Sequence, residues 1–232
     1  MHILAFNSSP RDNQTSKTEL VLQKFLEGAR RAGAVTETLY LRNFKINHCL
    51  GCFSCWTKTP GRCVQKDDMA EDLFDRYIQT DLAVLATPLY HYNMNARLKM
   101  FIERTLPMVM PAASSGQSGV AYRFAKIPKV AVISVCGFPA METFRCLSLN
   151  MQMIFGDLLA AEIYRHTSEA MVAPFLADKV QEVLAAVARA GEELVRSGKV
   201  LPETLAAATQ DLAPPELIRQ WAKEHWEGEM GQ

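Results

Sequence analysis

Residues 3–16 of the chain read ILAFNSSPRDNQTS, and this stretch decides the fold. Its first four residues form an uninterrupted apolar run, which is typical of a parallel strand that is buried on both faces. Hydroxyl, amide and guanidinium side chains follow, and they lead directly into a helical pattern over 16–31 in which Leu22, Phe25 and Leu26 share one face. The order strand, polar loop, helix predicts the first half of a parallel βα unit.

The same alternation continues along the chain. Further apolar runs occupy 35–41, 82–86, 129–135 and 160–164, and helical patterns follow from 67 and over 95–104, 141–155 and 178–196. Five such strands separated by helices predict an α/β fold with a doubly wound, five-stranded parallel sheet and helices on both faces. Short helices around 202–209 and 214–226 predict a C-terminal helical extension. We therefore expect a sheet domain over 1–170, with an irregular loop at 43–66 inserted, and C-terminal helices over 171–232 packed on the same domain.

Composition excludes several classes of function. The chain has 232 residues, and its 25 Lys+Arg balance its 25 Asp+Glu, so it has no overall basic field to hold a nucleic acid. No apolar run approaches the roughly 18 residues that a membrane span needs. The start of the sequence has no basic segment of the kind that opens a signal peptide. These features predict a cytoplasmic protein that binds neither nucleic acid nor membrane.

The loop over 8–16 is the first candidate site. In doubly wound sheets ligands bind outside the carboxyl ends of the strands. The free N–H groups and positive dipole end of the helix that follows suit a terminal phosphate. Ser16 and Glu19 form a possible capping box that would fix the helix start. Since the loop has neither G-x-x-x-x-G-K-[ST] nor G-x-G-x-x-G, it is not a dinucleotide or P-loop site. A simple turn with an N-cap and no ligand is the alternative.

Two motifs carry a family resemblance. Ser9-Pro10-Arg11 with Gln14-Thr15 resembles the loop G-S-P-R-x-x-[GS]-N-T of the NADPH-dependent FMN reductase and flavodoxin-like family. Residues 87–93 (TPLYHYN) and 98–104 (LKMFIER) resemble its second element, T-P-x-Y followed by L-K-x-F-[IL]-D-R. The chain departs from the family at Ser8, where Gly is usual, and at Gln14, where Asn is frequent. The resemblance covers about residues 1–165 and implies a flavodoxin-like, FMN-binding domain.

The resemblance also implies roles for individual residues. The FMN phosphate would be held by Ser9, Arg11, Gln14, Thr15 and Ser16. The flavin ring would be wrapped, largely through backbone groups, by Pro88, Leu89, Tyr90, His91, Tyr92 and Asn93. Its other side would be bordered by Cys136, Gly137 and Phe138, with His91 either beside the flavin or in a packing or surface role. No residue stands out as an acid–base catalyst, so the catalytic group is unknown.

Cysteines dominate the loop at 43–66. Cys49, Cys52, Cys55 and Cys63 follow the pattern C-x2-C-x2-C-x7-C, in which three thiols at i, i+3 and i+6 can wrap one compact cluster and the fourth can close it. The run resembles that of the iron–sulfur flavoproteins, a branch of the same family that holds a [4Fe-4S] cluster near FMN. Bare or redox-active thiols and a zinc site remain open alternatives. Cys136 and Cys146 are expected to be buried apolar residues.

The expected function is that of an FMN-dependent oxidoreductase. Electrons would come from NAD(P)H or a ferredoxin-like donor and pass through FMN, with or without a [4Fe-4S] cluster, to a small-molecule or protein acceptor. The alternatives are a cluster-free NAD(P)H-dependent FMN or quinone reductase and a non-enzymatic flavodoxin-like electron carrier. The Met-rich stretch 107–121, which is expected to be a loop or lid, and the C-terminal helices suggest a homo-oligomer, a dimer or tetramer.

Overall fold

The computed structural model describes residues 1–111 and 121–230. Five parallel strands form its sheet in the order β2-β1-β3-β5-β6. Their bounds are β1 His2–Asn7, β2 Val35–Tyr40, β3 Leu82–Tyr90, β5 Lys129–Val135 and β6 Leu159–Arg165. The predicted flavodoxin-like, doubly wound sheet of five parallel strands is confirmed, since this order is the flavodoxin one.

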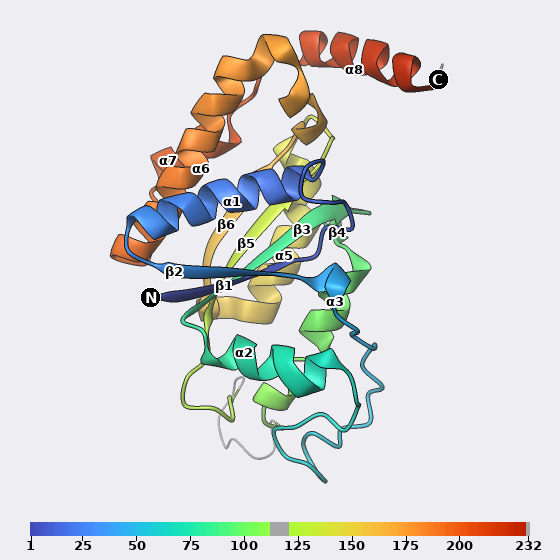
Figure 1. The fold of residues 1–232 in the computed structure, drawn as a ribbon, viewed down its shortest axis with the longest axis vertical. Coiled ribbons are helices and arrows are strands. Elements are labelled where there is room, and N and C mark those ends of the chain that lie inside the picture. The colour runs from blue at the N-terminus through green and yellow to red at the C-terminus, as the bar shows by residue number, and fades with distance from the viewer. Residues whose placement is uncertain (112–120, 231–232) are drawn as a thin grey trace.

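Helices cover both faces of the sheet (Figure 1). One face carries α1 (Lys17–Arg31) and α6 (Ala177–Ser197), and the other carries α2 (Phe74–Gln79), α3 (Ala96–Glu103) and α5 (Arg145–Phe155). Alternate residues of β1 point into the two cores: Ile3 packs on the α1 and α6 side, and Leu4 on the α2, α3 and α5 side. Because both faces are covered, the central strands have no polar face, which explains the continuous apolar runs in the sequence.

One hairpin was missed by the sequence analysis. The strand expected over 82–86 continues to Tyr90 and turns back into β4 (Asn93–Met94), where Leu89 pairs with Met94. The two turn residues, His91 and Tyr92, have φ angles of 47° and 62°. Two-residue hairpin turns with positive φ at both positions usually carry Asn or Gly, so His91 and Tyr92 carry no hairpin signal.

The helix expected from residue 67 begins as a π-helical turn over Met69–Leu73 before α2. The described residues also contain short 3-10 turns at Leu41–Asn43, Leu106–Met108, Met141–Phe144, Gly156–Leu158, Ser168–Val172 and Pro174–Leu176. The loop at 43–66 has no regular structure beyond Asn43, as expected. Of the stretch 107–121, Val109 forms an isolated bridge with Tyr122, and 112–120 lie outside the described residues.

The C-terminal extension packs through α6 onto α1 with backbone-to-backbone contact. A Cβ atom added to Gly28 would lie 1.7 Å from the carbonyl oxygen of Ala188, and one added to Gly191 would lie 2.0 Å from that of Phe25. Two further helices, α7 (Pro202–Thr209) and α8 (Pro215–Met230), complete the extension, and α8 projects from the top of the molecule in Figure 1. Among the described residues, none of the helices combines the length and apolarity needed to cross a bilayer.

Candidate functional site

A polar pocket of about 90 Å³ lies at the carboxyl end of the sheet. The end of β3 and the segments that follow β1 and β5 meet there, together with Ser168 and Glu169, which follow β6. The pocket is lined by eight of the residues expected to bind FMN: Ser9, Arg11, Ser16, Pro88, Leu89, Tyr90, Cys136 and Gly137. The other six, Gln14, Thr15, His91, Tyr92, Asn93 and Phe138, do not line it. Lys17, Thr18, Ser168 and Glu169, which sequence reasoning missed, also line it.

Two buried hydroxyls mark the start of α1. The hydroxyl of Ser16 caps the helix by accepting a hydrogen bond from the N–H of Glu19 at 3.1 Å, and it donates to Ser9 Oγ at 2.9 Å. Only this half of the predicted capping box forms, because the Glu19 carboxylate accepts instead from Asn7 Nδ2 (2.6 Å) and Tyr40 Oη (2.8 Å). The two hydroxyls and the helix dipole together give one end of the pocket anion-binding character.

The tip of the loop is occupied by its own carboxylate. Asp12 Oδ1 accepts hydrogen bonds from the backbone N–H groups of Gln14 and Thr15, both at 2.9 Å, and from the Thr15 hydroxyl at 3.1 Å. The bonds from Thr15 and Gln14 lower the pKa of Asp12. Gln14 and Thr15 thus turn toward Asp12 rather than the pocket, and sequence reasoning missed this local turn.

Two arginines flank the loop. Arg11 Nη1 lies 3.2 Å from Glu169 Oε1, so it joins the loop after β1 to the segment after β6 across the pocket, with half of its side chain exposed. Arg42, which sequence reasoning missed, donates to Asn13 Oδ1 at 2.7 Å on the outer side of the loop. Of the two, Arg11 is the cation that lines the pocket.

Ser8, where the family usually has Gly, fits without backbone strain. Its φ is not positive, and its buried hydroxyl donates to the carbonyl of Ala86 at 3.0 Å. The substitution therefore adds a bond between β1 and β3 and leaves the loop path intact.

The rim of the pocket carries two aromatic rings. Tyr92, at the β3–β4 turn, and Phe138, after β5, stack with their centroids 6.0 Å apart and their planes at 6°. Both side chains are about half exposed, and His91 at the same turn is exposed. The stack connects the hairpin to the segment after β5 and so joins the two segments expected to border a flavin ring.

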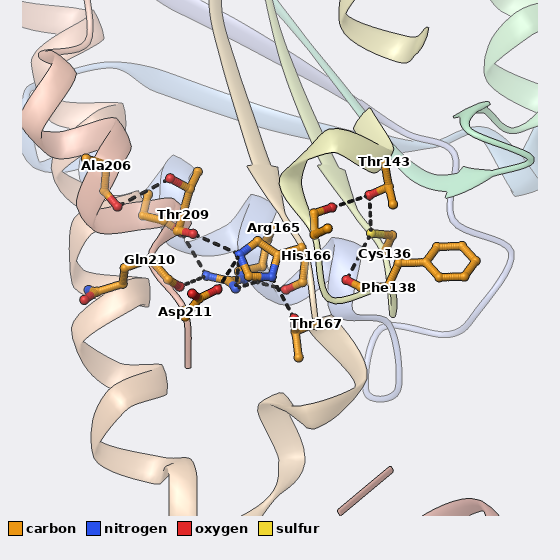
Figure 2. Close-up of polar contacts among 12 residues, drawn as sticks. Cys136, Phe138, Thr143, Arg165, His166, Thr167, Ala206, Thr209, Gln210 and Asp211 are labelled. Atoms are coloured by element: carbon orange, nitrogen blue, oxygen red, sulfur yellow. Dashed lines mark hydrogen bonds and ion pairs between the residues drawn. The ribbon is translucent and has the colours of Figure 1, made fainter. Parts of the chain in front are cut away.

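Figure 2 shows the end of β5 beside the end of β6. Cys136 is buried, with its Sγ 3.5 Å from Thr143 Oγ1 and 3.7 Å from the carbonyl of Phe138. Burial raises the pKa of this thiol, so it remains protonated at neutral pH and is not a nucleophile. Cys146 is exposed, so the expectation that it is buried was wrong: the neighbouring Leu147 faces the core instead.

Arg165 is fully buried at the end of β6 and anchors the C-terminal extension (Figure 2). It donates to the carbonyls of His166 (2.6 Å), Gln210 (2.7 Å) and Ala208 (3.4 Å), while His166 Nε2 lies 3.0 Å from the carbonyl of Thr209. Burial lowers the pKa of Arg165 to about 10, which still leaves it charged at neutral pH. These bonds hold the C-terminal end of α7 and the residue that follows it, Gln210, against the end of β6. The sequence contains no pattern that predicts them.

A second pocket, of about 380 Å³, adjoins the first. The two share Leu89, Cys136, Gly137 and Glu169. The second adds Phe138 from the rim and an apolar wall from α8, made by Ile218, Trp221, Ala222 and Trp226. The C-terminal helix thus borders the candidate site, which sequence reasoning did not anticipate.

The four loop cysteines line one small pocket of about 20 Å³, whose other walls are largely apolar. Their thiols are free, and Cys55 is buried whereas Cys52 is exposed. Burial, followed by the charge of neighbouring Cys63, raises the pKa of Cys55. Phe53 and Trp56 pack together beside the thiols, with ring centroids 5.0 Å apart.

No group of three His, Cys, Asp or Glu side chains in the described part of the chain is arranged to hold a single metal ion. Four thiolates around one zinc at about 2.3 Å each would lie only about 3.8 Å apart. In a cubane cluster each thiolate binds its own iron, so the sulfurs stand farther apart. Four soft thiol donors around one largely apolar pocket match the donor set of such a cluster.

The chain matches a known protein family. A sequence model of the family "NADPH-dependent FMN reductase" matches residues 1–125, which is more than half of the chain. The chain belongs to the NADPH-dependent FMN reductase family. The matched residues contain the polar loop, the β3–β4 hairpin and the four-cysteine loop.

Curated relatives match about half of the chain. An iron-sulfur flavoprotein of Archaeoglobus fulgidus is 35% identical over 107 residues, which are 46% of this chain and 46% of that protein. An iron-sulfur flavoprotein of Methanosarcina thermophila is 29% identical over 106 residues, 46% of this chain and 53% of that protein. The chain thus spans about half the length of the curated relatives it matches.

Solved structures share the fold over most of the chain. An NAD(P)H:quinone oxidoreductase from Methanothermobacter marburgensis superposes with a TM-score of 0.61 at 20% identity and covers 84% of this chain and 98% of its own. An FMN-dependent NADH-azoreductase from Bacillus anthracis, solved in complex with FMN, gives a TM-score of 0.62 at 15% identity, with 84% and 100% covered. At these identities the likeness establishes the fold alone.

Proposed function

We propose that the chain is an FMN-dependent oxidoreductase that takes electrons from NAD(P)H. The observation that carries the proposal is the polar pocket, where two buried serine hydroxyls at a helix start face Arg11, while strand-end backbone from β3 and β5 forms the opposite walls. Hydroxyls, a helix dipole and a guanidinium are the groups that bind a terminal phosphate. Membership in the NADPH-dependent FMN reductase family supports the same cofactor.

The residues present fit FMN better than a dinucleotide. The loop offers one anion-binding end and no glycine-rich fingerprint for a pyrophosphate. When bound, FMN accepts a hydride or single electrons, and the protein supplies binding and orientation. Ser9, Arg11 and Ser16 would hold the phosphate, and Pro88–Tyr90 with Cys136–Gly137 would border the ring. Gln14 and Thr15 would bind the phosphate only if their N–H groups broke the hydrogen bonds that they donate to Asp12.

The apolar pocket beneath α8 is proposed as the place where a small planar acceptor, or the nicotinamide, docks. It shares four residues with the polar pocket, and two tryptophans and Phe138 give it flat apolar walls. Aromatic walls suit planar rings because stacking adds to the burial of apolar area. On this proposal Trp221→Ala raises KM for a quinone acceptor more than it lowers kcat.

Cys49, Cys52, Cys55 and Cys63 are proposed to hold a [4Fe-4S] cluster. The thiol donor set around one pocket supports this, and so do the relatives described as iron-sulfur flavoproteins. A cluster-free reductase with redox-active thiols is the second candidate, favoured by the free thiols, of which that of Cys52 is exposed.

A homo-oligomer is also proposed. The outer face of α5 exposes Leu149 and Met153, one helical turn apart, and Met153 is 79% exposed. Adjacent exposed apolar side chains of this kind mark contact surfaces.

One preparation tests the function. Protein purified without oxygen is denatured to identify its flavin by chromatography, analysed for iron and sulfide, and assayed with NADH or NADPH and a quinone. FMN, turnover and about four irons per chain are expected. FMN with turnover but no metal would establish the cluster-free reductase, and FMN without turnover would establish the electron carrier. FAD, or no affinity for FMN after reconstitution, would refute the central proposal.

A further inference from the structure

A buried arginine closes the base of the cysteine loop. Arg104, the residue that follows α3, forms a two-pronged ion pair with Asp67: Nη1 donates to Oδ2 at 2.7 Å and Nη2 to Oδ1 at 2.9 Å. Nη1 also donates to the carbonyl of Asn47 at 2.9 Å, and Asp67 Oδ2 accepts from the Asn47 N–H at 2.8 Å. Asn47 and Asp67 stand just outside the four cysteines, so this network ties the two ends of the loop together.

The pair is completely removed from solvent, since the side chains of Arg104 and Asp67 are 1% and 0% exposed. Charges in such a site are screened little by salt or water, but these two are opposite, so their effects on groups beyond the pair largely cancel. Burying an ion pair is costly, and a purely structural tie could be made by neutral groups. Its position therefore calls for a reason beyond stability.

One nitrogen of the guanidinium has no partner. Arg104 Nε is buried and has no hydrogen-bond partner among the described residues. Buried donors are nearly always paired, so an orphaned one indicates a partner that completes the site. Arg104 also lines the pocket that the four thiols line. It lines a second small pocket as well, and of the four loop cysteines only Cys63 lines that one.

We propose that Arg104 is a positioning residue for the four-cysteine site, with its free Nε–H donating to the Cys63 sulfur or to an inorganic sulfide when the site is loaded. The inference rests on the proposed cluster and adds to it a defined role for one residue of the surrounding shell. Hydrogen bonds and positive charge near the sulfurs stabilise the more negative, reduced form of a cluster and so raise its reduction potential. The Nε–H of Arg104 would supply such a hydrogen bond from a position that solvent does not reach, while Asp67 offsets much of the positive charge.

Two variants separate this role from a structural one. Arg104→Lys keeps a positive charge opposite Asp67 but removes the Nε–H. The double variant Asp67→Asn with Arg104→Gln removes both charges together, so neither partner is left buried and unpaired. Arg97→Lys is the matched control. Arg97 lies on α3 itself and donates to the backbone carbonyls of Leu41 (2.9 Å) and Phe44 (3.3 Å). It does not line the cysteine pocket.

The readouts are iron per chain, visible absorbance and the midpoint potential of the metal centre in anaerobic titration, with FMN content as the measure of an intact fold. Both Arg104 variants remove the Nε–H, so both should keep FMN and shift the midpoint potential to lower values, while Arg97→Lys leaves it unchanged. Unchanged potentials in folded, iron-loaded variants would overturn the proposal. Loss of FMN together with iron would show that Arg104 is only a structural tie. Wild-type protein that binds no iron would refute the proposed cluster first, and this role of Arg104 with it.

Discussion

Replacing Arg11 with Ala is expected to weaken FMN binding by about tenfold. A charge-assisted hydrogen bond to a phosphate contributes roughly 1.5–3 kcal/mol. In the free protein Arg11 pairs with Glu169 at 3.2 Å, and an exposed pair of this kind is worth about 0–1 kcal/mol, which binding gives up. The difference, roughly 0.5–3 kcal/mol, corresponds to about 2- to 150-fold in affinity. Because half of the Arg11 side chain faces solvent, the lower part of that range applies.

The pairing with Glu169 provides a second, opposite variant. Glu169→Gln removes a negative charge from the pocket and frees Arg11, so the affinity for FMN should stay the same or rise by a factor of a few. In the Arg11→Ala background the same change at Glu169 should have a smaller effect, because there is no guanidinium left to free.

Fluorescence titration of apoprotein with FMN measures both effects, and circular dichroism confirms the fold. Arg31→Ala is the control. Arg31 pairs with Glu27 at 3.6 Å on α1, the helix that follows the loop, but it lies about 20 Å from the start of that helix. The affinity of Arg11→Ala should also depend less on salt than that of the wild type. A Kd within twofold of the wild type in folded Arg11→Ala protein would show that the phosphate lies elsewhere.

Three further outcomes are expected. Burial, followed by the charge of Arg165, lowers the pKa of His166 from its ordinary 6.5. The unfolded chain therefore takes up this proton at a higher pH than the folded protein, and the free energy of unfolding should fall as pH drops from about 6.5 toward the lower native pKa. Melting curves of His166→Gln should lack this part of the decline. Gly191→Ala should cost about 3 kcal/mol in urea unfolding, because its Cβ would meet the Phe25 carbonyl at 2.0 Å, and an unchanged midpoint would disprove the close contact. Met153→Glu should shift the protein to a smaller species in size-exclusion chromatography if α5 is the oligomer contact, whereas an unchanged elution volume would exclude that face.

The sheet could be predicted from the sequence because its signal is local. Each central strand is buried on both faces, so it appears as an apolar run, and a single general rule then brings the segments after three strands together. The β3–β4 hairpin could not be predicted, because His91 and Tyr92 adopt positive φ at a turn where Asn or Gly is usual. The role of Asp12 could not be predicted for a related reason. An Asp in a polar loop is common, and only the structure shows that it accepts hydrogen bonds from the N–H groups of Gln14 and Thr15.

Long-range polar contacts lie beyond sequence reasoning altogether. Arg165 donates to backbone carbonyls about 45 positions away in the sequence. Every residue has such a carbonyl, so the identity of the acceptor residues does not indicate the bond. The apolar wall from α8 depends on this anchor, since Arg165 and His166 hold the segment directly before that helix. The second pocket could therefore be found only once the chain was folded.

A single short helix connects the two candidate sites. At its start, Asn95 caps α3 by accepting from the Leu98 N–H at 3.1 Å, and its Nδ2 donates to the Ser8 carbonyl in the polar loop at 2.7 Å. At its end, Arg104 closes the cysteine loop. The nine residue steps between them span about 14 Å. Since both ends are buried and bonded, α3 holds the polar pocket and the thiol pocket at a fixed separation. The family motif over 98–104 therefore falls on the element that sets the distance between the two sites, although none of its residues lines the polar pocket.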